Sequence, residues 1–264
     1  MDWGMPTLLE AASPESAAAL CRELGLQFVE LNMNLPEYQE WDFPLLQRVA
    51  SRYQIYYTIH LDENLDPCYF NPHVAKAYLD AMLDAIEAAK RLRIPVINMH
   101  LAAGVYFTLP GEKVYLYDRY RERYLERLQA AIAHCEKAVA GAPLVICLEN
   151  TGDFALPYKR AALELFLQSP LFGLTFDIGH DQTAGNRDKP FFLEHWNRLR
   201  HFHIHDAAQG KNHLPLGTGV LDIPWYAALA EKTGSRAVVE VKTIQALRDS
   251  VQWLRKQGLG PIIS

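Results

Sequence analysis

The sequence predicts a single domain, a (β/α)8 barrel over residues 1–264. Short apolar runs alternate with longer amphipathic stretches along the chain, and we count eight of the former and about eight of the latter. Strict alternation indicates a parallel sheet whose strands are joined by crossover helices. Eight such units in roughly 250 residues are typical of this barrel. A doubly wound open sheet is the alternative architecture.

The expected strands are short runs of apolar residues, too short for helices that would need several turns. Their inward faces become more polar toward the carboxyl end of each run. In chain order they are residues 5–9, 27–31, 55–61, 95–101, 143–149, 172–177, 201–205 and 237–241.

Helical patterns separate these strands. The first begins at Ser13-Pro14-Glu15, with a capping serine and a proline at the first helical position, and stops at Gly25. Apolar residues recur at helical spacing in the later stretches, most clearly over 74–88, 125–139 and 247–254. We find no linker between the units, which favours one domain.

Side-chain alternation along the strands supports the barrel. On the strand at 143–149, Val145, Cys147 and Glu149 share one face, and the residues between them are all apolar. An apolar outer face is what a helix-covered sheet needs. The same alternation places inward the residues His60, His100, Asp177 and Glu240.

Composition narrows the class of protein. The chain is half hydrophobic, with a net charge of −5 and an isoelectric point near 6.1, so it offers no basic footprint for nucleic acid. Its four cysteines lack a CxxC spacing, and we see no signal peptide, so we expect reduced thiols and a cytoplasmic location. No apolar run approaches the roughly 20 residues of a membrane span. We therefore expect no membrane or nucleic-acid partner, and a homo-oligomer stays open.

Titratable residues gather at the carboxyl ends of six expected strands, the end at which barrel enzymes place their active sites. Burying such charges without partners would cost several kcal/mol each, and a divalent cation would offset that cost. A mixed imidazole and carboxylate set without cysteine suits Zn²⁺ or Mn²⁺ best, ahead of Co²⁺ or Mg²⁺. The residues are His60, His100, Glu149, Asp177, His180, His203 and Glu240.

Each residue also has a simpler interpretation. Glu149 and Asp177 could cap the turns that follow them, and Glu240 could pair with Lys242 or Arg236. A lone strand histidine is usually a core residue. These explanations would have to hold independently at six strand ends, so a metal site is the better interpretation.

The motifs in this region resemble a known superfamily. They are "LENTGD" (148–153), "FDIGH" (176–180), "HIHDA" (203–207), "HLPLGTGVLDI" (213–223) and "VVEVK" (238–242). Together they are similar to the xylose-isomerase-like TIM barrels, which include sugar isomerases and epimerases as well as endonuclease IV.

The resemblance implies a metal site made of Glu149, Asp177, His203 and Glu240. Of the three alternating histidines at 201–205, it makes His203 the ligand. His205 would then face the substrate or support the ligands, and His201 would be a hydrogen-bonded residue deeper in the barrel.

The resemblance to endonuclease IV extends to two further zinc sites. His60 and His100 match ligands of one, and His180 and His213 match ligands of the other. The aspartate expected two residues before His213 is Lys211 here, and a protonated lysine repels a cation, which argues against that last site. We therefore expect the surrounding histidines to contact substrate; they are His60, His100, His180, His205 and His213.

Three functions follow. The favoured one is a metal-dependent isomerase or epimerase of sugars, polyols or sugar phosphates, in which the metal stabilises an enediolate. Glu149 and Glu240 would be its catalytic acid and base, removing a proton from one face and returning it to the other. The alternative is an endonuclease IV-like hydrolase of DNA or another phosphoester. A non-catalytic metal-binding protein is the third.

Three loops on the same rim are of interest. The aromatic insertion at 104–120 and the segment at 61–72 would form either a lid or a set of aromatic residues packed on one another. "PLGTG" (215–219) lacks the lysine of a P-loop, so it is interpreted as a tight turn on the rim, and a phosphate contact keeps modest weight.

Overall fold

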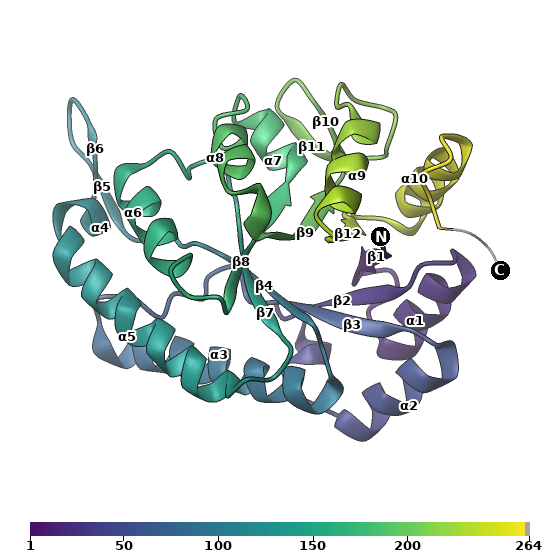
Figure 1. Cartoon of the computed structure of the whole chain (residues 1–264), viewed down its shortest axis with the longest axis horizontal. Helices are drawn as coiled ribbons and strands as arrows, with labels where there is room; N and C mark the ends of the chain where they lie inside the picture. Colours follow the sequence, from purple (N-terminus) through teal and green to yellow (C-terminus); the bar gives the residue numbers. More distant parts are fainter. Residues whose placement is uncertain (262–264) are drawn as a thin grey trace.

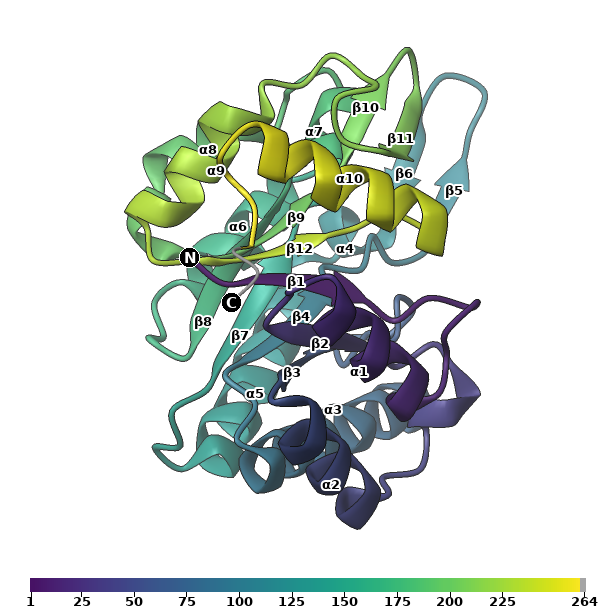
Figure 2. The ribbon, with the colours of Figure 1, turned by 90° about the vertical axis from the view of Figure 1, so that its right-hand side faces the viewer.

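Eight parallel strands close into a barrel in the computed structural model, which describes residues 1–261 (Figures 1 and 2). Neighbouring strands follow the order β1, β12, β9, β8, β7, β4, β3 and β2, and the circle closes between β2 and β1. The predicted (β/α)8 barrel is therefore confirmed. The strands are β1 (Trp3–Pro6), β2 (Phe28–Asn32), β3 (Tyr56–His60), β4 (Val96–His100), β7 (Val145–Glu149), β8 (Phe172–Asp177), β9 (Leu199–Ile204) and β12 (Arg236–Val239).

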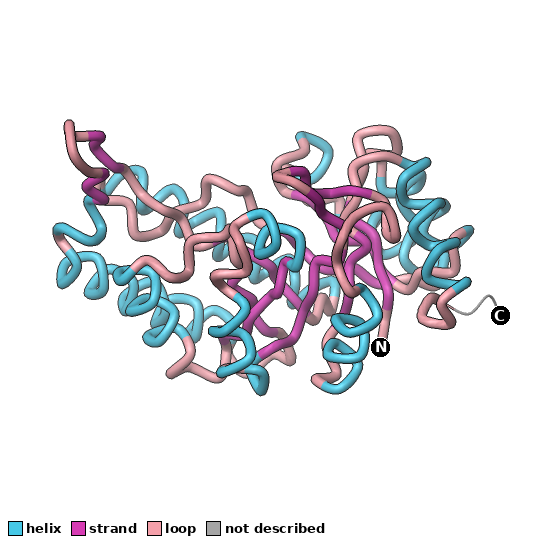
Figure 3. Tube along the Cα trace, turned by 90° about the horizontal axis from the view of Figure 1, so that it is seen from above, coloured by secondary structure: helices cyan, strands magenta, loops and turns pink. Residues whose placement is uncertain are grey.

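Helices surround the strands, as the view in Figure 3 shows. The first begins at the predicted cap: the Ser13 side chain accepts a hydrogen bond from the backbone N–H of Ser16, and Pro14 is the first helical residue. The longer helices are α1 (Pro14–Glu23), α2 (Phe43–Tyr53), α3 (Pro72–Leu92), α5 (Arg121–Val139), α6 (Pro157–Phe166), α9 (Ile223–Lys232) and α10 (Ile244–Lys256), and the short ones are α4 (Leu116–Arg119), α7 (Ile178–Thr183) and α8 (Lys189–Glu194).

Two antiparallel hairpins extend from the carboxyl ends of the strands, beyond the regular alternation. One pairs β5 (Tyr106–Thr108) with β6 (Lys113–Tyr115), and it projects from the body of the molecule (Figures 1 and 3). The other pairs β10 (Asp206–Ala208) with β11 (Lys211–Leu214). The second hairpin brings His213 over the barrel mouth.

The first strand lies earlier than predicted. It covers Trp3–Pro6 rather than 5–9, and Leu8 instead bridges to Ala11 in the turn that follows. The prediction placed the strand too late because it followed the apolar run to its last residue. That residue, Leu9, is 81% exposed and lies outside the strand. An apolar run marks burial on average and does not mark the residue at which a strand ends.

The predicted alternation of faces holds. Outward residues such as Ile59, Ile146 and Phe176 are fully buried beneath the helices. Inward residues meet one another instead: the Thr58 hydroxyl donates to Glu30, 28 residues away. All four cysteines are free and buried. Within residues 1–261, no helix is long and apolar enough to cross a membrane.

Candidate metal centre and active site

Four ligand groups converge at the carboxyl end of the barrel. Glu149 and Asp177 are the last residues of β7 and β8, His203 lies in β9, and Glu240 directly follows β12. One ligand atom from each lies within 4.8 Å of the others, and all four residues are buried. From Nδ1 of His203, the carboxylates of Glu149, Glu240 and Asp177 are 3.0, 3.3 and 3.9 Å away. The structure thus brings together the ligand set that the resemblance implied.

The donor set fits a divalent cation. Three carboxylates and one imidazole nitrogen surround a common point, and among the described residues Oε2 of Glu240 is buried without a hydrogen-bond partner. An uncompensated buried carboxylate oxygen is costly. A set of oxygen and nitrogen donors without sulfur suits Zn²⁺ or Mn²⁺.

Glu30 of β2 supports this site, and the sequence analysis missed it. Its carboxylate accepts hydrogen bonds from Nε2 of His203 at 2.8 Å and from Nε2 of His201 at 2.9 Å. With the proton of His203 on Nε2, the lone pair of Nδ1 faces the three carboxylates, the usual arrangement of a metal-binding histidine with a carboxylate behind it. Glu30 is a single carboxylate in the apolar run "QFVEL", and the alternation argument applied to that run would have found it.

The charges of the cluster shift its pKa values in opposite directions. Burial alone would raise the pKa of Glu149 and of Glu240, but their cationic neighbours together hold both pKa values well below the usual range: His203 with His100 for Glu149, and His203 with Lys242 and His213 for Glu240. Burial would lower the pKa of His203, whereas Glu149, Glu30 and Glu240 raise it. A cation bound among the carboxylates would replace the proton on Nδ1 of His203.

His60 and His100, the last residues of β3 and β4, lie beside Glu149. Their Nε2 atoms are 3.3 and 3.4 Å from Oε2 of Glu149, which also accepts a hydrogen bond from the side chain of Asn98. Burial would lower the pKa of His60, but its contact with Glu149 raises that pKa to about 9.

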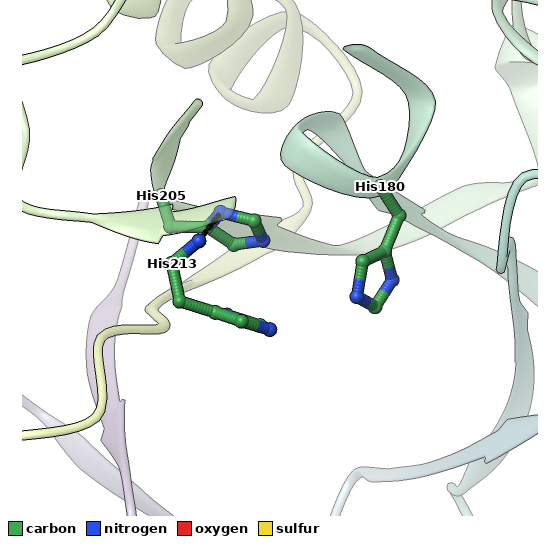
Figure 4. Close-up of side chains that lie close together, drawn as sticks. All are labelled: His180, His205 and His213. Atoms are coloured by element: carbon green, nitrogen blue, oxygen red, sulfur yellow. Dashed lines mark hydrogen bonds between the residues drawn. The ribbon is translucent and has the colours of Figure 1, made fainter. Parts of the chain in front are cut away.

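Three further histidines lie close together (Figure 4), each with a ring nitrogen within 4 Å of a carboxylate oxygen of Asp177 or Glu240. His180 comes from α7, His205 follows β9, and His213 lies in β11. Ring centroids are 4.2 Å apart for His205 and His213 and 5.4 Å apart for His180 and His213. Lys211 is exposed at the start of the same hairpin strand.

A cavity of about 340 Å³ is lined by both Glu240 and His60. Asn32, Asn34 and Glu63 line it, and Leu8 and Leu35 form an apolar wall. Lys242 is also in the lining, and its Nζ lies 2.8 Å from Oε1 of Glu240. From the sequence, Lys242 was expected only as an ion-pair partner of Glu240. Asn32, at the end of β2, and Asn34, in the loop after it, were not predicted, because no sequence motif marks them.

The glycine-rich loop at 215–219 already has an acceptor for its amides. The backbone N–H groups of Gly217, Gly219, Leu221 and Ala207 donate to the carboxylate of Asp206, at 2.9 to 3.1 Å. These groups are therefore not free to hold a phosphate. The loop is the tight turn that the sequence predicted.

The aromatic insertion at 104–120 divides into two parts. Tyr117 is buried, stacks on Tyr124 with ring centroids 4.2 Å apart, and donates to Asp66. Tyr106 and Phe107, at the hairpin, are about half exposed. The part of the insertion around Tyr117 therefore packs against other aromatic residues of the body. The β5–β6 hairpin exposes aromatic side chains that could contact other molecules.

Comparisons with known proteins agree with this fold. Residues 18–257 match the family model described as "Xylose isomerase-like TIM barrel". The uncharacterized protein MJ1311 of Methanocaldococcus jannaschii is 25% identical over 218 residues, which are 78% of this chain and 70% of that protein.

Solved structures share the fold. A D-tagatose 3-epimerase-like protein superposes with a TM-score of 0.79 at 24% identity, over 97% of this chain and 96% of that one. The TTHB071 protein of Thermus thermophilus, whose crystal was soaked with ZnCl₂, gives a TM-score of 0.70 at 24% identity, over 98% and 99% of the two chains. Because the family model covers most of the sequence and the barrel is closed, the chain belongs to the xylose isomerase-like TIM barrel family.

Proposed function

We propose that this protein is a divalent-metal-dependent isomerase or epimerase of sugars, polyols or their phosphates. The observation that carries the proposal is the pair of buried carboxylates, Glu149 and Glu240, which reach His203 from different strands of the barrel. Two structures with the same fold support it: one is an L-ribulose 3-epimerase and the other a 3-keto-D-glucoside 4-epimerase.

The cavity beside Glu240 would hold the substrate. Its asparagine amides and the carboxylate of Glu63 suit hydroxyl groups, and its leucine wall suits the carbon chain. A cation held by Glu149, Asp177, His203 and Glu240 would polarise the substrate carbonyl and lower the energy of the enediolate formed next to it.

Proton transfer would belong to the two glutamates. With pKa values held below the usual range, both are carboxylates at neutral pH and can accept a proton from carbon. The Lys242 ammonium fixes Oε1 of Glu240, so the free oxygen of that carboxylate faces the centre. One glutamate would remove the proton and the other would return one to the opposite face.

Deuterium exchange tests the proposal. In heavy water, a panel of ketoses, inososes and their phosphates should include a substrate that exchanges the hydrogen next to its carbonyl. Glu149→Gln and Glu240→Gln should each lower the exchange rate by about 10²-fold or more. Metal content is measured on the same samples, and Glu112→Gln, an exposed carboxylate in the β5–β6 hairpin, is the control. A protein that cleaves abasic-site DNA and catalyses no exchange would contradict it.

Phosphoester hydrolysis is the second candidate, and the histidines beside Glu149 favour it. His60, Glu149 and His203 form a further group whose ligand atoms lie within 4.8 Å of one another, and it shares Glu149 and His203 with the first group. Two or three tightly bound ions per chain and cleavage of abasic-site DNA would support hydrolysis. One ion together with carbon-hydrogen exchange would support the isomerase.

A further inference from the structure

His205 lies between the β10–β11 hairpin and the carboxylate of Asp177. Its Nε2 is 3.1 Å from both Oδ1 and Oδ2 of Asp177. Its Nδ1 is 2.8 Å from the backbone nitrogen of His213, whose N–H points at it. The imidazole is fully buried. Both ring nitrogens are therefore engaged by identified partners.

The contact with the backbone determines where the proton of His205 resides. A backbone N–H can only donate, so Nδ1 must be the unprotonated acceptor, and the single proton of the neutral ring lies on Nε2. The carbonyl oxygen of Asp206 is 3.3 Å from the same Nδ1, a longer contact that would need a proton there and would break the shorter one. Nε2–H is thus a donor to Asp177 and has no lone pair for a metal.

The backbone at His213 and at Gly179 accommodates the hydrogen bond from the His213 N–H to His205. His213 has a positive φ of 52°, unusual for a residue with a side chain, and this conformation directs its N–H toward His205. Its ring Nδ1 lies 3.1 Å from the carbonyl oxygen of Glu240, to which it donates. A Cβ at Gly179 would be 1.9 Å from Cε1 of His205, so only glycine leaves room for the ring.

We propose that His205 is a positioning residue, held in its Nε2–H form by the His213 backbone, that orients the Asp177 carboxylate for the metal. The inference rests on the proposed metal binding by Asp177. It also means that the three histidines of Figure 4 do not form a three-histidine metal site. The hairpin is coupled through His213 to two ligand residues, to Asp177 by way of His205 and to Glu240 at its backbone carbonyl.

Nitrogen NMR of the ring tests the proton position directly. In the Zn²⁺-loaded protein labelled with ¹⁵N-histidine, His205 should show a protonated Nε2 and an unprotonated Nδ1, with its signals assigned by their loss in His205→Asn. A proton on Nδ1 would overturn the proposal. So would coupling of a ring nitrogen of His205 to ¹¹³Cd in the Cd²⁺-loaded protein, because that nitrogen would then be a ligand.

Two amide variants separate the two hydrogen bonds. Gln places its amide near the position of Nε2 and keeps a donor to Asp177, whereas Asn reaches only the position of Nδ1. His205→Asn should raise the Zn²⁺ dissociation constant by about tenfold or more, and His205→Gln by about threefold or less. His134→Asn, an exposed histidine on α5, is the control and should change nothing.

The outcomes are distinct. Equal dissociation constants for the Asn and Gln variants would overturn the positioning role. Loss of all binding in both would make His205 a ligand and would overturn it as well. If the unmodified protein bound no divalent metal, the proposed function would fail, while the ring spectrum of the metal-free protein would still show whether the His213 backbone holds the Nε2–H form.

Discussion

At the residue scale, Glu30 determines which ring nitrogen of His203 faces the cluster of carboxylates. The 2.8 Å hydrogen bond from Nε2 of His203 leaves Nδ1 for the proposed metal ion, and the same carboxylate also accepts from His201 and Thr58. Burial would raise the pKa of Glu30, but the two histidines hold its pKa well below the usual range. One carboxylate thus orients two of the three alternating histidines at 201–205.

Replacing Glu30 tests this support. In Glu30→Gln, the amide nitrogen meets a histidine or hydroxyl donor, so one buried hydrogen bond is lost. We expect a loss of about 2 kcal/mol in the free energy of unfolding and a metal dissociation constant raised about tenfold or more. Denaturant unfolding and metal titration measure the two effects. Glu112→Gln is the matched control, and unchanged metal affinity in Glu30→Gln would contradict the role.

At the element scale, β9 and the residue that follows it show why alternation was informative. His201, His203 and His205 share one face but differ in their partners. His201 contacts Glu30, His203 contacts both Glu30 and the carboxylates of the cluster, and His205 contacts Asp177. Their order along the strand followed from the sequence, including the deeper position of His201. The turn after β11 was also predicted as a tight turn, but its anchor, Asp206, was not.

Asp206 organises the loop at 215–221, and its replacement tests that role. In Asp206→Asn, the amide nitrogen faces backbone N–H groups that now have no acceptor, such as those of Gly217 and Gly219. We expect a loss of about 2 kcal/mol in stability and faster amide exchange confined to this loop and the β10–β11 hairpin. Hydrogen exchange read by mass spectrometry measures it, with Asp249→Asn on α10 as the control. Exchange that rises uniformly over the chain would contradict a local role.

At the scale of the whole molecule, the proposed metal centre would link stability to pH and to metal binding. In the metal-free protein the pKa of His60 is raised to about 9, from 6.5 for an unperturbed histidine. Its contribution to stability is complete below about pH 6.5 and is lost as the pH rises through 9. Metal binding needs unprotonated imidazole at His203, whose pKa the neighbouring carboxylates raise, so binding strengthens as the pH rises.

The melting temperatures of the two forms should therefore diverge. Between pH 6.5 and 9 the metal-free protein should become less stable, and the gap between the metal-loaded and chelated samples should widen. Calorimetry across this range, with and without a chelator, measures the gap. A metal-free protein whose melting temperature rises with pH in this interval would contradict the shift at His60.

The sequence by itself determined the barrel, the faces of its strands and the residues at their carboxyl ends. Strand and helix periodicities are local properties of the backbone, so Glu149, Asp177, His203 and Glu240 could be placed on one rim from spacing and motif alone. Only the tertiary structure decided how these residues are supported. Glu30 meets His203 across 173 positions of sequence, and His205 receives the N–H of His213 because one residue of a hairpin has a positive φ. Such contacts depend on the register in which distant strands close and on the path of the loops, and the periodicity of a single sequence contains neither.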